Sequence, residues 1–206
     1  MIRNNLAILM SERGIKNGEL SLRTGISKNT ISATAKGDGK MIQLETIDKI
    51  CQALEVTPND FFSYTPYNVS FKSILNKCEY TFDINDFYEF TGITFDDIEF
   101  DLLLTIERSN RKISDCFVTI EKQGVASPLG IDMVIAPVDE NNFNEFTEQF
   151  EKIPLIFRLD IIDKIEDDIQ KQLQEFVIDT DKSSLDYNEL DLKTNTQILL
   201  HGFSTF

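Results

Sequence analysis

Residues 19–37 constrain the fold of this chain more than any other segment, because their apolar, polar and glycine positions fit two short helices joined by a tight turn. Leu20 and Ile31 supply one apolar anchor in each helix. Gly25 stands between the helices, where the chain needs the left-handed backbone that glycine tolerates best. Ser27 follows as a favourable N-cap, since its hydroxyl can accept a hydrogen bond from a free amide of the second helix.

The second helix is expected to show water only short or cationic polar side chains at its start, while Ile31 faces inward. This set comprises Lys28, Asn29, Thr30 and Ser32, and the helix is expected to end at Lys36 and Gly37. Asparagine can pair with adenine and lysine with guanine through base edges. A helix with this surface therefore suits the major groove of DNA.

Apolar spacing predicts further helices on both sides of this segment. The first such helix is indicated by apolar residues at helical spacing, Leu6, Leu9 and Met10, and this pattern ends at Gly14. Asn17 is expected to cap the next helix. A later set with i, i+3, i+4, i+7 spacing predicts one apolar helix face and comprises Leu44, Ile47, Ile50, Cys51 and Leu54. Thr57 and Pro58 then give an N-cap followed by proline at the first helical position, a strong start signal. Two aromatic residues are expected to close the bundle, Phe61 and Phe62.

From about Met1 to Tyr64 these features resemble the helix-turn-helix domain of the Cro and phage repressor (XRE) family. The motif positions that match are Ser21 as the early small residue, Gly25 in the turn, Ile26 after it and Ile31 in the second helix. The downstream matches are Leu44, Glu45, Thr46, Ile47, Ile50, Cys51, Leu54 and residues 57–62. The family more often has alanine where this chain has Ser21, so the serine hydroxyl needs a hydrogen-bond partner.

The resemblance implies an all-α, lambda-repressor-like N-terminal domain of five helices that binds double-stranded DNA. It implies base contacts from the second motif helix, which begins after Ser27, through Lys28, Asn29, Thr30 and Ser32. It implies phosphate contacts from the start of the first motif helix and from the rim, through Lys16, Asn17, Arg13, Arg23, Lys36 and Lys40. The residues alone leave open an ordinary small helical bundle with no nucleic-acid role, since the same geometry occurs without DNA binding.

Charge divides the chain. Residues 1–66 hold eight Lys and Arg against seven Asp and Glu, so the remaining residues carry −16 of the total of −15. Phosphate contacts are local, so a neutral-to-basic lobe can bind DNA although the whole chain is acidic. The acidic remainder would repel DNA and make binding steeply salt-dependent. Strong DNA affinity is not expected from one copy, and formation of a homodimer is expected to compensate.

Beyond a seam at residues 63–69, the pattern predicts a second domain of the α+β class. The expected hairpin pairs residues 98–107 with 113–121, and further strands are expected at 131–138 and 196–200. Helices are expected at 142–150 and 160–177. The predicted organisation is a helix-turn-helix domain at 1–64, a linker at 65–70, and an acidic ligand, oligomerisation or partner domain at 71–206. No family is recognised for this second domain.

No residue set in the second domain indicates catalysis, a metal site or a cofactor. His201 is the only histidine, and a lone histidine beside apolar residues is usually structural or exposed. Ser127 is the nearest candidate for the nucleophile of a self-cleaving repressor, but no recognisable lysine base accompanies it. We therefore expect no enzyme activity and no cofactor.

Two acidic clusters allow more than one interpretation. The first comprises Asp96, Asp97, Glu99 and Asp101, and the second comprises Asp179, Asp181, Asp186, Glu189 and Asp191. The second could be a calcium loop, but it lacks the mid-loop glycine and terminal glutamate of an EF-hand. A solvated acidic surface is the simpler interpretation. A surface that docks a basic protein, or masks the DNA-binding face, is a third.

The sequence thus predicts a DNA-binding transcriptional regulator, most consistent with a repressor that binds an operator as a homodimer. The alternative is an antitoxin-like or phage-derived regulator whose acidic domain binds a protein partner. Three distant cysteines, the lack of a long apolar run and the polar start of the chain favour a cytoplasmic protein without membrane contact.

Overall fold

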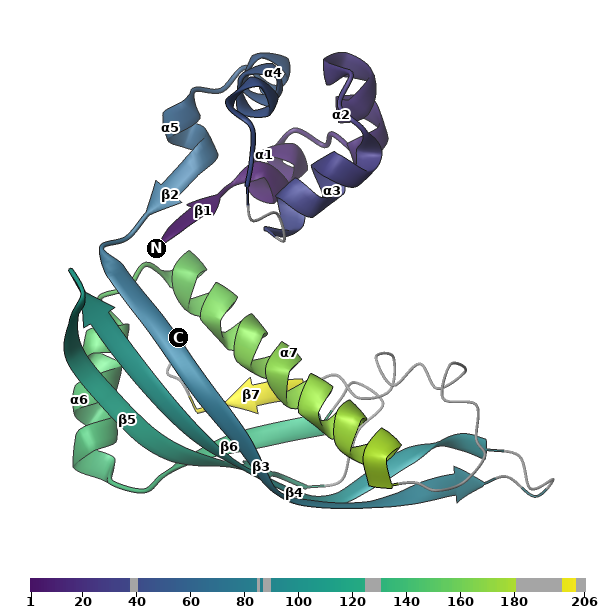
Figure 1. The fold of residues 1–206 in the computed structure, drawn as a ribbon, viewed down its shortest axis with the longest axis vertical. Helices are drawn as coiled ribbons and strands as arrows, with labels where there is room; N and C mark the ends of the chain where they lie inside the picture. Colours follow the sequence, from purple (N-terminus) through teal and green to yellow (C-terminus); the bar gives the residue numbers. More distant parts are fainter. Residues whose placement is uncertain (38–40, 85, 87–89, 125–130, 181–197, 203–206) are drawn as a thin grey trace. The chain divides into compact units, whose positions relative to one another are not determined.

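The computed structural model describes residues 1–37, 41–84, 86, 90–124, 131–180 and 198–202. The chain divides into two compact units, unit 1 at Met1–Pro66 and unit 2 at Tyr67–Phe206 (Figure 1). Within the described ranges, no helix has the length and apolar character needed to cross a membrane.

Unit 1 contains helices that follow one another through short turns. Their bounds are α1 (Leu6–Glu12), α2 (Asn17–Thr24), α3 (Lys28–Lys36), α4 (Leu44–Leu54) and α5 (Pro58–Phe61). Thr57 caps α5 as the sequence predicts, and the structure adds a capping box: the Thr57 hydroxyl accepts from the Asp60 amide, and the Asp60 carboxylate accepts from the Thr57 amide. Pro58 stands in the first turn, where its missing N–H costs nothing.

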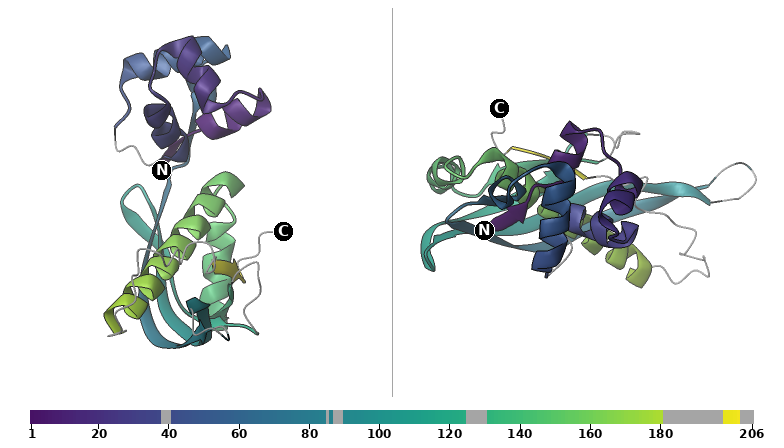
Figure 2. Two further views of the ribbon diagram at one scale, coloured as in Figure 1. Left: turned by 90° about the vertical axis from the view of Figure 1, so that its right-hand side faces the viewer. Right: turned by 90° about the horizontal axis from the view of Figure 1, so that it is seen from above.

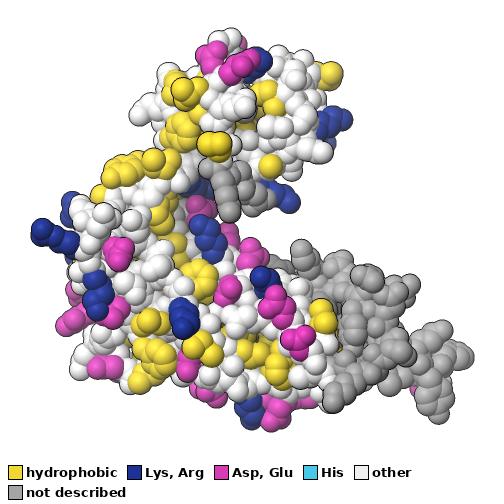
Figure 3. All heavy atoms as spheres, in the orientation of Figure 1, with side chains coloured by type: hydrophobic (Ala, Val, Ile, Leu, Met, Phe, Trp, Pro, Cys, Tyr) yellow, Lys and Arg dark blue, Asp and Glu magenta, His cyan; other side chains and the backbone are white. Residues whose placement is uncertain are grey.

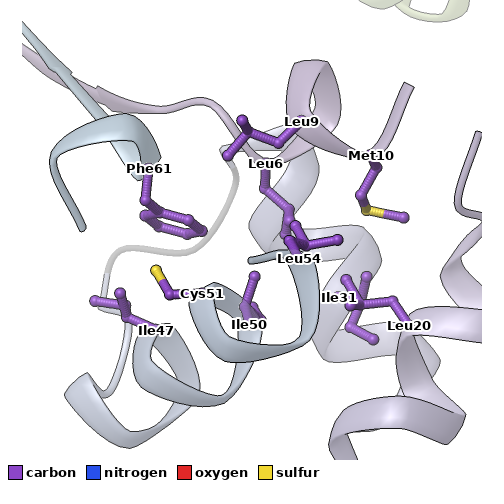
Figure 4. Packing of buried hydrophobic residues seen from close by; sticks show 10 residues of the cluster. All are labelled: Leu6, Leu9, Met10, Leu20, Ile31, Ile47, Ile50, Cys51, Leu54 and Phe61. Atoms are coloured by element: carbon purple, nitrogen blue, oxygen red, sulfur yellow. The ribbon is translucent and has the colours of Figure 1, made fainter. Parts of the chain in front are cut away.

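The core of unit 1 is a single apolar cluster to which every helix contributes (Figure 4). Its members are Leu6, Leu9, Met10, Leu20, Ile31, Ile47, Ile50, Cys51, Leu54 and Phe61. The predicted apolar set is therefore confirmed except at Leu44 and Phe62. Leu44 is 83% exposed, because it is the first residue of α4 and its side chain lies beyond the packed turns.

Unit 1 is not all-α as predicted. Strand β1 (Ile2–Asn4) pairs antiparallel with β2 (Phe62–Tyr64), and Phe62 therefore belongs to a strand instead of closing the bundle from a helix. Each strand has only three residues, too few for alternation to appear in the sequence. The two strands also come from the two ends of the sequence of unit 1, so no turn motif between them indicates that they pair.

Unit 2 is built on a five-stranded sheet in the order β3-β4-β5-β6-β7. The strands are β3 (Tyr67–Ile84), β4 (Phe90–Arg108), β5 (Arg111–Lys122), β6 (Ile131–Pro137) and β7 (Ile198–His201). The first four run antiparallel in sequence order, and β7 pairs parallel with β6. The predicted hairpin is the β4–β5 pair, with Leu104 opposite Cys116.

Two helices pack on one face of this sheet (Figure 2). Helix α6 (Glu140–Phe150) lies against β4 and β5, and α7 (Leu155–Thr180) reaches both edge strands, β3 and β7. The covered face carries a buried residue at every second position of β4, namely Ile98, Phe100, Leu102, Leu104 and Ile106. The opposite face is open to solvent, with Ile74, Leu103 and Phe117 partly exposed. Unit 2 is therefore sheet-rich with helices, as the α+β prediction expects.

Two predictions for this region need correction. Residues 67–70 belong to β3, so only Thr65 and Pro66 separate β2 from β3, not a linker over 65–70. The sequence interpretation also contained no strand over residues 67–84, although β3 is one of the two longest strands. Its register with β4 shifts at three places, and the first, between Leu75 and Lys77, interrupts the alternation of partly buried and exposed residues along β3.

Several predicted features lie outside the described residues. These are Lys40, Ser127, and Asp181, Asp186, Glu189 and Asp191 of the second acidic cluster. His201 is described, and its Nε2 lies 3.0 Å from Oδ1 of Asp132 at an exposed site. Among the described residues, no three His, Cys, Asp or Glu side chains converge as metal ligands would.

Candidate nucleic-acid interface

The turn between α2 and α3 has the geometry that its sequence predicts. Gly25 ends α2 with φ +72°, a left-handed conformation that glycine adopts without strain. The Ser27 side chain then accepts a hydrogen bond from the Thr30 amide at 3.1 Å and caps α3. Gly37 ends α3 with φ +76°. These local features fix where α3 begins and ends.

The hydroxyl of Ser21 has the partner that its position requires. Its Oγ donates to the carbonyl of Ile26 at 2.6 Å, which joins α2 directly to the turn. Thr24 adds two bonds at the same corner: its hydroxyl donates to the Leu20 carbonyl and accepts from the Ile26 amide. Hydroxyl bonds of Ser21 and Thr24 therefore join the end of α2 to the turn that precedes α3.

Helix α3 is held to unit 1 by one face. Ile31 is fully buried, and Thr34 is almost fully buried one turn later. Asn4 of β1 donates its side-chain amide to the Thr34 carbonyl at 3.0 Å, and its Oδ1 accepts from the Leu6 amide. The sequence interpretation did not include Asn4, because its bond spans thirty residues.

The outer surface of α3 carries most of the predicted site. Lys28, Asn29, Thr30 and Lys36 are exposed and Ser32 is half-buried. Ala33 is also exposed and lies one turn after Asn29, and an alanine methyl suits contact with a thymine methyl. The i, i+4 spacing from Asn29 is the sequence signal that could have identified it.

Lys28 lies against the start of α2. A Cβ at Gly18 would stand 3.5 Å from Lys28 Cε, so the lysine stem packs over this glycine. That contact places the Lys28 side chain beside the first turn of α2, where Lys16 is exposed. Among the residues that the structure describes, no acidic group lies within ion-pair distance of Lys16, Lys28 or Lys36. These three cations are available to an anionic ligand.

Two other predicted site residues, Asn17 and Arg23, are less available to a ligand. Asn17 is the first residue of α2 and half-buried, and the N-cap is Lys16, so the prediction that Asn17 caps this helix is wrong. Arg23 pairs with Glu19 at 2.5 Å and reaches the Ala53 carbonyl of α4.

Arg13 has a structural role. Its guanidinium donates to the carbonyls of Leu54, at 2.9 Å, and Leu9, at 3.2 Å, and so ties α1 to the end of α4. The sequence could not distinguish this anchored arginine from a free one, because the partner that ties it to α4, the Leu54 carbonyl, is distant in the chain.

Comparison with known proteins assigns this part of the chain. Residues 5–67 match the model of the Cro/C1-type helix-turn-helix DNA-binding domain. A 60-residue stretch is 37% identical to an uncharacterized HTH-type transcriptional regulator, YozG, of Bacillus subtilis. The match covers 29% of this chain and 71% of that protein. The chain therefore belongs to the family of proteins with a Cro/C1-type helix-turn-helix domain, and the family model ends where unit 2 begins.

Proposed function

We propose that this protein is a transcriptional regulator that represses its target by binding an operator sequence as a homodimer. The observation that carries the proposal is the surface of α3: a capped helix, fixed by Ile31, that presents Lys28, Asn29 and Thr30, with no ion pair from Lys28 to any described residue. The similar Bacillus subtilis protein bears the name of a transcriptional regulator, which supports the same role.

In this proposal the base edges are contacted by four residues of α3: Lys28, Asn29, Thr30 and Ser32. Ser27 lies where α3 enters the groove. Lys16, Asn17 and Lys36 bind phosphates on either side. Arg23 is the least available member, since leaving Glu19 would cost it an ion pair. Lys40 is included from sequence alone.

A homodimer is proposed because one copy of unit 1 has little charge with which to hold DNA. Its eight cations face seven acids, and the rest of the chain carries −16. Two copies that read half-sites about one helical turn apart combine two sets of base contacts on one duplex. The mass of the free chain and of its DNA complex in solution tests this directly, and a complex with one chain per operator contradicts it.

The first experiment is selection of bound duplexes from a random pool with the full chain. Asn29→Ala is then expected to relax preference at one or two base pairs, because a good base contact contributes about 1–3 kcal/mol of discrimination. Lys36→Ala is expected to weaken all duplexes alike and to lower the salt slope by about 1. Lys49→Ala serves as control, because Lys49 pairs with Glu45 on α4.

Equal losses on selected and random duplexes for Asn29→Ala and Lys36→Ala would contradict the assigned roles. Recovery of no duplex would contradict DNA recognition itself. A reporter with the selected sequence at its promoter then separates repression, seen as reduced expression, from activation.

The charge of unit 2 favours a second candidate, in which the acidic surface binds a basic protein and DNA binding serves autoregulation. A basic partner that co-purifies at low salt and dissociates at high salt supports it. A chain that purifies alone at both salt concentrations contradicts it.

A further inference from the structure

The tip of the β4–β5 hairpin is the one dense group of cations in unit 2. Residues 67–206 contain twelve Lys and Arg against twenty-eight Asp and Glu, and three of the twelve lie within five consecutive positions. These are Arg108, Arg111 and Lys112, all exposed. We call residues 108–112 the basic tip. Lys and Arg side chains gather at this end of the sheet in Figure 3.

The basic tip has a defined shape. Ser109 and Asn110 have φ of +52° and +60°, as in the two-residue type I′ turn that matches the twist of a hairpin. Arg108 and Arg111 are directly opposite each other across the ladder. Like charges in that position repel, so the pair is a cost to the hairpin that an anionic ligand would remove.

The cations of the basic tip are only partly neutralised. Lys112 pairs with Asp115 at 3.1 Å. Arg108 lies over the ring of Tyr67, 5.5 Å from its centroid, which orients the guanidinium without cancelling its charge. Arg111 makes no ion pair with any described residue. Two arginine guanidinium groups are therefore available, and arginine is well suited to binding phosphate.

The basic tip lies at the end of the sheet where the chain enters from unit 1. Tyr67, the strand partner of Arg108, follows Pro66, the last residue of unit 1. The basic tip therefore lies beside the point where unit 2 is joined to unit 1.

We propose that the basic tip binds backbone phosphates of the same duplex that α3 reads. This inference rests on the proposed function, since it requires that unit 1 binds DNA. The contact gives the acidic unit a preferred orientation: its one cationic projection meets the duplex, and most of its carboxylates lie farther away. It adds affinity without sequence preference, because phosphates carry no base information.

The test compares two variants of the full chain with equal charge. Arg111→Gln with Lys112→Gln removes one unpaired and one paired cation from the basic tip. Lys164→Gln with Lys171→Gln removes a matched set from the exposed side of α7, where Lys171 pairs with Glu175. Affinity for the selected duplex is measured from 50 to 300 mM salt.

The tip variant is expected to bind about five- to tenfold more weakly at roughly 100 mM salt, with a salt slope smaller by up to about 2. The α7 variant is expected to keep the wild-type slope. A cleavage reagent on Ser109→Cys should cut phosphates within about one helical turn of the selected site, and the same reagent on Lys164→Cys should not.

Equal slopes for the tip and α7 variants, with wild-type binding intact, would overturn this inference and leave the proposed function standing. Failure of the wild-type chain to bind any duplex would overturn both. A tip variant with altered oligomeric mass and an unchanged slope would show that the arginines bind another copy of the acidic chain, which also overturns the inference.

Discussion

Ser27 offers a perturbation that separates the stability of α3 from its contact with DNA. Its Oγ accepts from the Thr30 amide at 3.1 Å and lies 2.8 Å from the Thr30 hydroxyl. Asparagine and aspartate cap helices as well as serine does, whereas alanine does not. Three substitutions at this position therefore vary the cap and the charge independently: Ser27→Ala, Ser27→Asn and Ser27→Asp.

The expected magnitudes follow from this geometry. Ser27→Ala loses the cap and should destabilise α3 by about 1 kcal/mol, whereas the other two should remain close to wild type. Ser27→Asp adds a negative charge at the end of α3 that would enter the groove. For two phosphates taken at about 6 Å from this charge, each repulsion is about 0.7 kcal/mol at the dielectric constant of water. The sum corresponds to a loss of about tenfold in DNA affinity.

Hydrogen exchange of the α3 amides measures the first effect, and 1 kcal/mol corresponds to about fivefold faster exchange. Fluorescence anisotropy with the selected duplex measures the second. Ser27→Asn should match wild type in both assays, and Ser27→Asp should lose affinity alone. If Ser27→Asp binds DNA as tightly as Ser27→Asn, the start of α3 is not near phosphate, and the proposed orientation of the helix is refuted.

Three further outcomes are expected. Asn4→Ala removes the bond to the Thr34 carbonyl and a second bond at the start of α1, so α3 amides should exchange faster by an amount equivalent to about 2 kcal/mol. Burial raises the pKa of Glu166, so this carboxylate weakens unit 2 as pH rises towards its folded pKa. Glu166→Gln should therefore reduce the fall in stability that occurs between the pKa of an unfolded-chain glutamate and the raised folded pKa, measured by urea unfolding, while the Leu200 amide keeps an acceptor. Burial raises the pKa of Cys116 to about 11, so iodoacetamide at pH 8 should modify it far more slowly in the folded chain than in urea.

The fold of unit 1 could be predicted well because its signals are local. Gly25, Ser27 and Thr57 each specify a helix end through neighbouring residues, and the structure places all three as expected. The β1–β2 pair could not be predicted, since its two strands come from the two ends of the sequence of unit 1. The contact of Asn4 with Thr34 likewise joins residues that are far apart in the sequence.

Strand β3 was not predicted because a polar residue on its buried face interrupts the apolar alternation in the sequence. Val69 and Phe71 alternate with polar residues as a half-buried strand requires, but the next pair reverses the pattern. Ser73 faces α7, where it donates to Asp168 and accepts from Gln172, while Ile74 is exposed. A serine in an inward position satisfied by helix side chains is indistinguishable, in sequence, from a break in the strand.

The candidate site was predictable as a set of residue types but not as a set of available groups. Lys28 and Arg23 look alike as cations, yet Arg23 is paired with Glu19 and Lys28 is not. Whether a cation can meet phosphate depends on which neighbours the fold gives it. The order of availability within the site therefore comes only from the structure.

The difference in charge between the two units also bears on which cations affect DNA affinity. Repulsion from exposed carboxylates is screened beyond about 8 Å at physiological salt, so the total of −16 overstates what a bound duplex would experience. Only charges within that distance of a phosphate alter affinity, whatever the sign of the whole unit. If the basic tip contacts phosphates as proposed, its cations act across a short distance, whereas Lys171 on α7 is paired with Glu175. Equal changes in net charge at these two places must then have unequal effects on the salt slope, and a dependence on net charge alone would contradict both proposed contacts.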